Sequence, residues 1–413
     1  MNKTCLAVDV GKSSSCYALY RTHDPSLGAE GVETLIPPRK VANSRRMLMS
    51  LLKEAKEKSG DGFVVAMEST GIYHLPIQRF FADAGQEVIV INPLITGKTV
   101  AGLRLTKTDA LDTMKIALSV FRGEQNRQRC SSPEYDKMRD LARMLESAMD
   151  RLAAAKTKLL SVLWRTAPEY EKCFEKSGVF AKSVLALVEK YPHSADIRAA
   201  RRTSMEGTML SAMGFKSSKR SVECVSRLKE ASKDSLPCVE RDSPLRDEAA
   251  ALVRETRRMK MRADELSAEL ADMCRDKPLF GILTGIEGLN EKMAALITAE
   301  TGDMDRFETR QQFAAFAGTD PRKKESGTSL NADGSITKRG NSHLRRWLSL
   351  AALVFIMHAD AGDFAKEIEG YYRAKRGTKE NGGATHHHLY ALTAATNKLI
   401  RKIFGKYKAL AKA

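Results

Sequence analysis

Residues 5–12, CLAVDVGK, form a short apolar run that ends at Asp9 and leads directly into a glycine and a lysine. A second apolar run, residues 16–20, comes after a few polar residues, so we predict two strands joined by a hairpin. A third run at residues 62–67 leads into Glu68. The chain therefore begins with short strands, and two of them end next to a carboxylate.

Segments with helical periodicity lie between and after these strands. Residues 43–58 place their apolar side chains on one face, residues 75–84 and 109–121 are also predicted as helices, and residues 87–91 are predicted as a strand. Strands that alternate with helices predict a mixed sheet covered by helices, which is an α/β domain. We assign this domain to residues 1–130.

The pattern changes after about residue 130. From Pro133 to Leu163 no further glycine or proline occurs, and apolar residues fall near heptad spacing; residues 247–274 are a second long helical segment. Heptad spacing is typical of paired long helices. We predict a helical coiled-coil domain over residues 131–276, suited to dimerisation or to reaching along nucleic acid, with a polar insert at residues 166–245 whose role the sequence does not assign.

The last segment, residues 277–413, is predicted to be a compact and mostly α-helical domain. Its apolar stretch, residues 347–359, contains a serine and a histidine and is too short to span a bilayer, so we expect a buried helix there. Trp164 and Trp347 are both expected in hydrophobic cores.

Composition restricts the class of protein. The 68 lysines and arginines outnumber the 51 aspartates and glutamates, which gives a net charge of +17. Such a surplus favours a polyanionic partner, although an unrelated basic enzyme could share it. Seven cysteines without a Cys-x-x-Cys pair argue against a disulfide framework and against zinc, and for a reducing compartment. The N-terminus MNKTCLAVDV has no long apolar run of the kind found in a secretion signal, so we expect a cytoplasmic protein with no membrane partner.

Four carboxylates in the first domain could hold metal. Asp9 and Glu68 end predicted strands, and Asp109 and Asp112 lie three residues apart at a helix start, which places them on one helix face. A pair of Mg²⁺ ions could use such a set to stabilise the attacking and leaving oxygens of a phosphoryl displacement. Taken singly, Asp109 could equally be a helix cap and Asp112 a partner of the helix dipole. The joint arrangement resembles the ribonuclease-H-like fold, in particular its RuvC-like, Holliday-junction-resolvase branch.

A second candidate group lies in the last domain. Ser326 precedes Gly327 in a polar stretch with many basic residues nearby. A serine beside phosphate-binding cations could attack a DNA phosphodiester and leave a phosphoserine link, provided that a base or metal activates it. It could equally be an ordinary loop serine. The residues predicted to bind nucleic acid are Lys107, Arg322, Lys323, Lys324, Lys338, Arg339, Arg345 and Arg346.

The ordered set of blocks resembles the transposases of the insertion-sequence 110 family, the bridge-RNA-guided DEDD recombinases. The matching blocks are AVDVGK (7–12), MESTGIYH (67–74), INPLITGKTVAGLRLTKTDALD (91–112) and FAAFAGTDPRKKESGTSLNADGSITKRGNSHLRR (313–346). The resemblance covers about two-thirds of the chain and leaves the middle unmatched in detail.

This resemblance implies a transposase that excises and inserts a mobile element, in a nucleoid-associated form in a bacterium or archaeon. It implies that Asp9, Glu68, Asp109 and Asp112 hold Mg²⁺ and that Ser326 is the nucleophile. It further implies donor and target DNA as partners, a guide (bridge) RNA, and a homodimer or tetramer in which the RuvC-like domain of one subunit meets the serine domain of another. The chain departs from the family pattern at Glu325, where a serine is usual, and at Thr113, where an alanine is usual.

Two other functions fit the same residues. A hydrolytic nuclease of ribonuclease-H-like fold would arm a metal-bound water and form no covalent intermediate. A non-catalytic nucleic-acid-binding protein would bind in a salt-dependent way and cut nothing. The presence of all four carboxylates together with Ser326 argues against the second of these alternatives.

Overall fold

The computed structural model describes residues 3–60, 62–69, 71–91, 109–123, 132–214, 218–326, 329–338, 340–377 and 387–410. The chain divides into two compact units, Met1–Ser132 and Pro133–Ala413, and each is described by itself. No helix in the described ranges is both long and apolar enough to cross a membrane.

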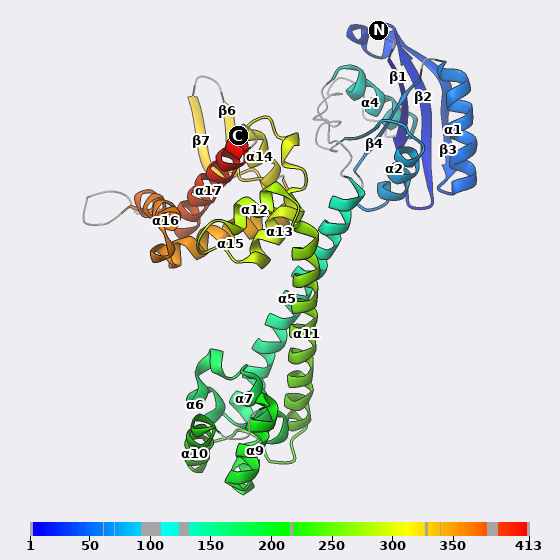
Figure 1. Cartoon of the computed structure of the whole chain (residues 1–413). Coiled ribbons are helices and arrows are strands. Elements are labelled where there is room, and N and C mark those ends of the chain that lie inside the picture. Colours follow the sequence, from blue (N-terminus) through cyan, green and yellow to red (C-terminus); the bar gives the residue numbers. More distant parts are fainter. Residues whose placement is uncertain are drawn as a thin grey trace. The chain divides into compact units, whose positions relative to one another are not determined.

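The first unit is a mixed sheet with helices on both faces (Figure 1). Its strands lie in the order β3-β2-β1-β4-β5; β1 is antiparallel to β2 and parallel to β4, and β4 is parallel to β5. Its elements are β1 (Lys3–Asp9), β2 (Ser14–Thr22), η1 (Pro25–Gly31), β3 (Val32–Ala42), α1 (Arg45–Ser59), β4 (Val64–Glu68), α2 (His74–Asp83), β5 (Val88–Ile91) and α4 (Asp109–Phe121).

Alternating residues of the strands supply two separate cores. Leu6 and Val8 of β1 pack with side chains of α1 and α2, whereas Cys5 and Ala7 pack with α4. Successive residues of a strand point to opposite faces, so both sets need to be apolar and the strand is almost continuously hydrophobic. The sheet is therefore covered on one face by α1 and α2 and on the other by α4.

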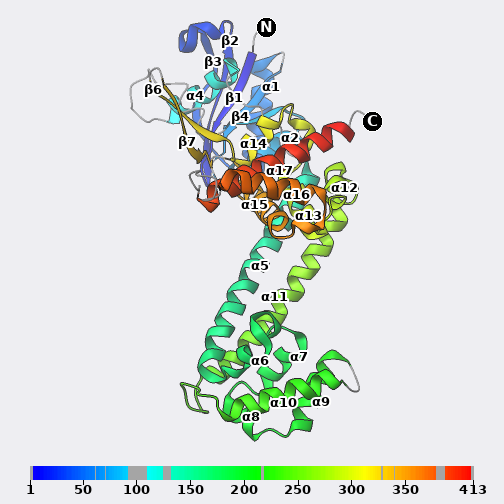
Figure 2. The same ribbon diagram turned by 90° about the vertical axis from the view of Figure 1, so that its left-hand side faces the viewer.

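The second unit is built on two long helices. It begins with α5 (Pro133–Thr166), α6 (Glu169–Gly178), α7 (Lys182–Lys190), α8 (Ser194–Ala199), α9 (Arg202–Met213), α10 (Lys219–Lys233) and α11 (Leu245–Cys274). Figures 1 and 2 show α5 and α11 side by side along most of their length. They run antiparallel, because the start of α5 shares a core with the end of α11 and the end of α5 shares another with the start of α11. The predicted long helices are present, and they pair within one chain.

The insert between the long helices is a small helical bundle. Its core combines Leu159 and Leu163 of α5 with residues of α7, α10 and α11, such as Val188 and Leu228. Trp164, however, is 66% exposed, so its expected place in a core is wrong. The buried stripe of α5 runs through residues 159, 162, 163 and 166, and Trp164 falls off that stripe at 3.6 residues per turn.

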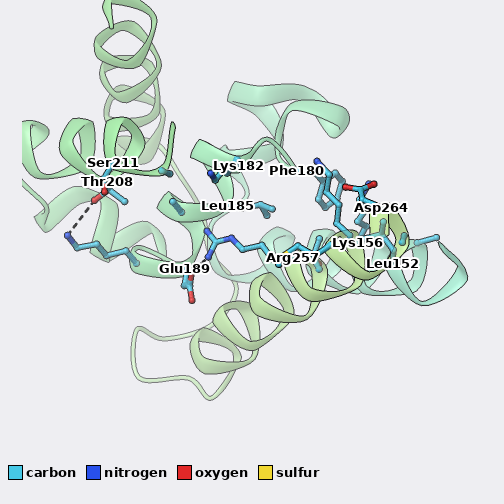
Figure 3. A pocket seen from close by; sticks show the side chains of 18 of the residues that line it. Leu152, Lys156, Phe180, Lys182, Leu185, Glu189, Thr208, Ser211, Arg257 and Asp264 are labelled. Atoms are coloured by element: carbon cyan, nitrogen blue, oxygen red, sulfur yellow. Dashed lines mark hydrogen bonds and ion pairs between the residues drawn. The ribbon is translucent and has the colours of Figure 1, made fainter. Parts of the chain in front are cut away.

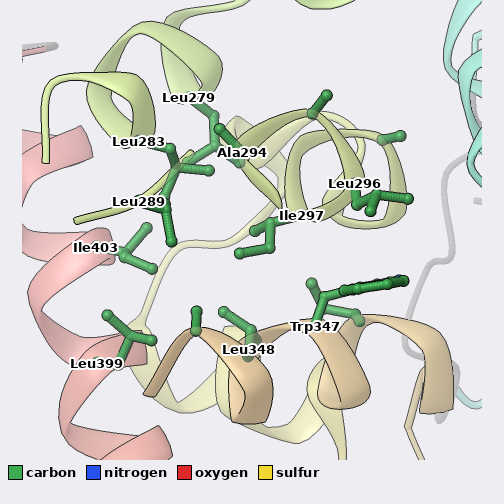
Figure 4. Close-up of a cluster of buried hydrophobic side chains, with 14 of the residues drawn as sticks. Leu279, Leu283, Leu289, Ala294, Leu296, Ile297, Trp347, Leu348, Leu399 and Ile403 are labelled. Carbon is green, nitrogen blue, oxygen red and sulfur yellow. The ribbon is translucent and has the colours of Figure 1, made fainter. Parts of the chain in front are cut away.

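The C-terminal part of the second unit packs around α15. Its elements are α12 (Pro278–Thr284), α13 (Glu291–Thr301), η2 (Met304–Arg306), α14 (Arg310–Ala317), β6 (Pro321–Ser326), β7 (Ser329–Ile336), α15 (Ser342–Met357), η3 (Ala359–Ala361), α16 (Asp363–Arg376) and α17 (His388–Leu410). Figure 4 shows Leu283, Ile297, Leu348 and Leu399 converging from α12, α13, α15 and α17. Trp347 is buried in this core as expected, and α15 is the buried helix predicted there.

Ion pairs fasten this core to α5. The guanidinium of Arg346 on α15 lies 2.6 Å from a carboxylate oxygen of Glu146 and 2.5 Å from one of Asp150. The side chain of Glu146 is 9% exposed, and His343 Nδ1 lies 2.6 Å from its other oxygen. The hydrogen bonds that Arg346 donates to Asp150 and Glu146 raise the pKa of its guanidinium. A partly buried carboxylate thus depends on α15 for its counter-charges.

We expect Arg346→Ala to lower the free energy of unfolding by about 1–3 kcal/mol, because Glu146 would keep its burial and lose its strongest partner. Arg373→Ala is the matched control, since Arg373 forms an ion pair within the single helix α16, is largely exposed, and should change stability by less than about 0.5 kcal/mol. Urea unfolding followed by tryptophan fluorescence measures both, with Trp164→Phe in each protein so that Trp347 reports. Equal stabilities of the two variants would contradict the assigned role.

Candidate active site

Two of the predicted carboxylates end neighbouring parallel strands. Asp9 is the last residue of β1 and Glu68 the last of β4, and the register pairs Val8 with Met67 immediately before them. Both carboxylates are partly exposed. Asp9 and Glu68 are 59 positions apart in the sequence. The carboxyl ends of β1 and β4 nevertheless place them next to each other at the same end of the sheet.

The pleat places both side chains on the same face. Asp9 continues the alternation of Cys5 and Ala7, and Glu68 continues that of Ala66, and these apolar residues form the core under α4. Asp9 and Glu68 are therefore on the face of the sheet that α4 covers. They are the last residues of β1 and β4, so they follow directly after the apolar residues that form this core. The helix that covers this face, α4, contains the other two predicted carboxylates in its sequence.

A buried hydrogen bond fixes α4 on this face. The Tyr20 hydroxyl on β2 lies 3.1 Å from the Thr113 hydroxyl, and Thr113 is fully buried. Burial raises the pKa of Tyr20, so its hydroxyl stays protonated at neutral pH. The Thr113 hydroxyl thus supplies a contact that an alanine could not make. It holds the helical turn that carries Asp112.

Of the two carboxylates of α4, the structure describes the side chain of Asp112 but not that of Asp109. Asp112 is partly exposed and accepts a 2.8 Å hydrogen bond from Lys115 Nζ one turn later. Asp109 is the first residue of α4, and its side chain lies outside the described residues. Among the described side chains, no group of three or more His, Cys, Asp or Glu residues is placed to hold a metal ion. Asp9, Glu68 and Asp112 alone therefore do not form a ready-made cage.

The oxygen donors nevertheless suit a hard divalent cation. Mg²⁺ in phosphoryl-transfer sites is commonly held by one or two carboxylates and by substrate phosphate and water oxygens, so a closed protein cage is not required. Asp9 and Glu68 on one sheet face meet that requirement. Asp112 has two carboxylate oxygens, of which Lys115 contacts Oδ1.

The turn after Asp9 is locked by residues that carry no functional signal in the sequence. Ser15 Oγ accepts a 3.2 Å hydrogen bond from the Gly11 amide and donates one of 2.9 Å to Asn43 Oδ1, while Asn43 Nδ2 donates to the Gly11 carbonyl at 2.9 Å. A Cβ at Gly11 would lie 2.2 Å from the Ser14 carbonyl oxygen, so only glycine fits. These contacts hold the strand end that carries Asp9.

Ser326 ends a strand, where the polar sequence around it predicts a loop. Strands β6 and β7 form an antiparallel hairpin in which Ser326 pairs with Ser329, next to the connection at residues 327 and 328. The hairpin is fastened at its root, where Thr337 Oγ1 donates a 2.5 Å hydrogen bond to Asp320 and Asn397 of α17 donates one of 2.9 Å to the Thr319 carbonyl. The hairpin thus projects from a fixed base.

The basic run after the hairpin is shaped by close backbone contacts. A Cβ at Gly340 would lie 2.2 Å from the Phe316 carbonyl oxygen and 2.4 Å from the Gly318 nitrogen. Asn341 caps α15 by accepting from the amides of His343 and Leu344, and its Nδ2 donates a 2.7 Å hydrogen bond to the fully buried Glu300. These contacts, which no sequence motif reveals either, set the direction in which α15 leaves the hairpin.

The predicted nucleic-acid-binding residues fall into three groups. Lys338 is exposed, whereas Arg345 donates a 3.0 Å hydrogen bond to the Ala317 carbonyl and Arg346 is held by α5. Their binding to nucleic acid stays a prediction. The strand β6 carries Arg322, Lys323 and Lys324, whose side chains, like that of Ser326, lie outside the described set, as do Lys107 and Arg339 entirely.

Comparisons with known proteins bear on both groups of candidate residues, the carboxylates and the hairpin. A DEDD transposase model of IS110 type matches residues 8–168, and the model of the IS116/IS110/IS902 transposase family matches residues 281–369. The first match spans all four carboxylates, and the second spans the hairpin and α15. Together the two matches cover more than half of the chain.

Individual relatives agree with the family models. The chain is 24% identical over 360 residues to an uncharacterised 43.6 kDa protein of the insertion element IS110 of Streptomyces coelicolor, covering 86% of this chain and 84% of that protein. It is 28% identical over 139 residues to the transposase for IS1328 of Yersinia enterocolitica, covering 33% of this chain and 38% of that one. The chain belongs to the IS110 family of transposases. It is thus an enzyme that acts on DNA.

Proposed function

We propose that this transposase cuts and rejoins the DNA strands of an insertion sequence through a phosphoserine intermediate. In this proposal Ser326 is the nucleophile, and Asp9, Glu68, Asp109 and Asp112 hold Mg²⁺. The observation that carries the proposal is the pleat, which puts Asp9 and Glu68 on the sheet face covered by α4. The sheet order, with an antiparallel meander next to two parallel strands, supports a ribonuclease-H-like, RuvC-like domain over residues 1–130.

Each residue has a distinct task in the reaction. The Ser326 oxygen forms a new ester bond to the DNA phosphorus as the bond to the leaving DNA oxygen breaks, and the serine proton ends on that leaving hydroxyl. Bound Mg²⁺ would neutralise charge on the phosphate oxygens and lower the pKa of the serine hydroxyl. The four carboxylates would hold the Mg²⁺, and the cations near the hairpin hold the flanking DNA backbone. Because the phosphoserine link keeps the ester bond energy, attack by a DNA hydroxyl can reverse the step and rejoin the strand.

The remaining partners belong to the same proposal. The carboxylates and Ser326 lie in different compact units, which fits an active site that two subunits share, in a homodimer or a tetramer. The net charge of +17 supports binding of donor and target DNA together with a guide RNA. Residues 131–276 would form a coiled-coil domain between the catalytic domain and the transposase domain at 277–413.

Covalent trapping tests the mechanism directly. The protein is incubated with Mg²⁺ and a plasmid that carries the two ends of the element, then denatured and digested. We expect a protein–DNA adduct whose peptide contains Ser326, since the link is covalent. Clean nicking without an adduct would instead favour a hydrolytic nuclease on the same fold, and salt-dependent binding without cleavage under any metal would favour a non-catalytic binding protein.

A further inference from the structure

A large groove lies in the second unit, and its lining contains none of the predicted catalytic residues. Its volume is about 1330 Å³, and its walls come from α5, α7, α9, α11 and the first turn of α13. Figure 3 shows Phe180, Lys156 and Asp264 grouped at one end, Thr208 and Ser211 at the other, and Leu185 between them. The helical insert and the two long helices thus form this groove together.

The positive charge of the side chains that line the groove favours a polyanionic ligand. Among the residues that the structure describes, six basic side chains and two carboxylates, Glu189 and Asp264, line it. Glu189 is already paired with Arg254 and Arg257, so its charge is compensated within the protein. The six basic residues are Lys156, Lys182, Lys190, Arg257, Lys260 and Lys292.

Three of these lysines are available to a ligand. Lys182 and Lys260 are exposed and Lys292 is half-buried, and none of them forms an ion pair with any residue in the described ranges. Lysines in a groove that lack a carboxylate partner leave a local positive potential that attracts phosphates. A second copy of this chain, which is itself strongly basic, is a poor occupant on the same ground.

The rest of the lining suits a single strand with exposed bases. The side chain of Phe180 is partly exposed, with Lys156 Nζ 5.1 Å from its ring centre, and Leu152 and Met261 give apolar surface nearby. The opposite wall is α9, whose groove-lining residues Ser204, Gly207, Thr208, Ser211 and Ala212 are all small. Cations that follow a backbone beside an aromatic ring on which a base can stack are the usual features of single-strand binding sites.

We propose that this groove binds a single-stranded segment of nucleic acid, with phosphates on Lys182, Lys260 and Lys292 and a base against Phe180. The inference rests on the proposed function only in that it supplies a nucleic-acid partner. It needs neither the carboxylates nor Ser326. An RNA strand and a DNA strand share this chemistry, and the experiment separates them.

Charge reversal tests the groove. The full chain carrying Lys182→Glu, Lys260→Glu and Lys292→Glu is compared with a control carrying Lys172→Glu, Lys219→Glu and Arg220→Glu, which makes the same change of net charge on α6 and α10 outside the groove. Affinity for an unstructured 20-nucleotide RNA, and for DNA of the same sequence, is measured by fluorescence anisotropy without metal over a range of salt.

We expect the groove variant to lose at least about 10-fold in affinity relative to the control, and its salt slope to become shallower by about 2, because three phosphate contacts are lost. The oligonucleotide for which the affinity of the groove variant falls more, RNA or DNA, is identified as the ligand of the groove. Equal affinity of the two variants overturns the proposal. Unchanged affinity together with an altered molecular mass in light scattering also overturns the proposal, because the groove would then be a protein interface.

A second measurement uses the unaltered protein, so it does not depend on the variant folding. Photo-cross-linking of the same oligonucleotides carrying 4-thiouridine or 4-thiothymidine should mark peptides of α7 and α11, which contain Leu185 and Met261. Cross-links found only elsewhere overturn the proposal. Both measurements can be repeated in Ser326→Ala protein, so loss of groove binding and failure of the serine mechanism are distinguishable.

Discussion

Replacing Ser326 by alanine is expected to lower the rate of strand exchange by at least about 10³-fold, to the background of the assay. The reason is chemical: alanine has no oxygen to form the ester, and removing the nucleophile of an enzyme that works through a covalent intermediate commonly costs more than this. A plasmid carrying the two element ends, scored for recombinant product at several times, measures the rate.

The matched control is Ser329→Ala, because Ser329 pairs with Ser326 across the β6–β7 hairpin and the substitution removes the same atom one strand away. We expect the control to recombine within about 10-fold of the parent. DNA binding should be unchanged in both variants, since neither loses a charge. Parental rates in Ser326→Ala would remove the serine from the mechanism and leave the carboxylates with a metal-bound water as the nucleophile.

The outcome for Ser326 also bears on Glu325. A carboxylate beside an attacking serine repels the phosphate, so Glu325→Gln should leave the rate unchanged or raise it. A marked fall would mean that Glu325 takes the serine proton, a role that general-base catalysis allows for a carboxylate within hydrogen-bond reach.

Much of the first unit could be predicted from sequence because its elements depend on local pattern. The continuous apolar runs that became β1 and β4 are what strands covered on both faces require, and helix α4 begins and ends at the residues predicted, 109 and 121. Strand β3 was missed. It contains Pro37 and Pro38 and many exposed polar residues, which only an edge strand tolerates, and edge position is a property of the sheet and not of the segment.

The side-chain hydrogen bonds that position the candidate residues cannot be predicted from sequence pattern, for a different reason. Asn43 meets Gly11 from 32 residues away, and Asn341 meets Glu300 from 41. An asparagine in a polar stretch gives no sign of which backbone group it will bind. The same holds for Arg346, whose charge suggested phosphate binding and whose partners on α5 lie 196 and 200 residues away. Strand β6, PRKKES, has no apolar alternation and gives no periodic signal, whereas β7, SLNADGSI, alternates apolar and polar residues but contains turn-forming residues that favour a loop.

Asp9→Asn is expected to lower the rate of strand exchange by about 10³-fold, because a metal-assisted step loses several kcal/mol of transition-state stabilisation when the ion is weakly held. Asparagine keeps the size of the side chain, so the turn held by Asn43 should survive. The control is Asp83→Asn at the end of α2, on the opposite face of the sheet from α4, where we expect less than about a 3-fold change.

Measuring Mg²⁺ binding distinguishes a role of Asp9 as a metal ligand from a purely structural role. In the parent, Mg²⁺ at 100 times its dissociation constant should stabilise the folded state by about 2.7 kcal/mol and raise the melting temperature, since the ion binds only the folded site. In Asp9→Asn the melting temperature should respond to Mg²⁺ much less, while the metal-free value stays near that of the parent. A variant that recombines poorly but keeps the full Mg²⁺ response would show that Asp9 acts on the DNA and not on the metal. Loss of both together would place Asp9 among the metal ligands, beside Glu68 on the sheet face under α4.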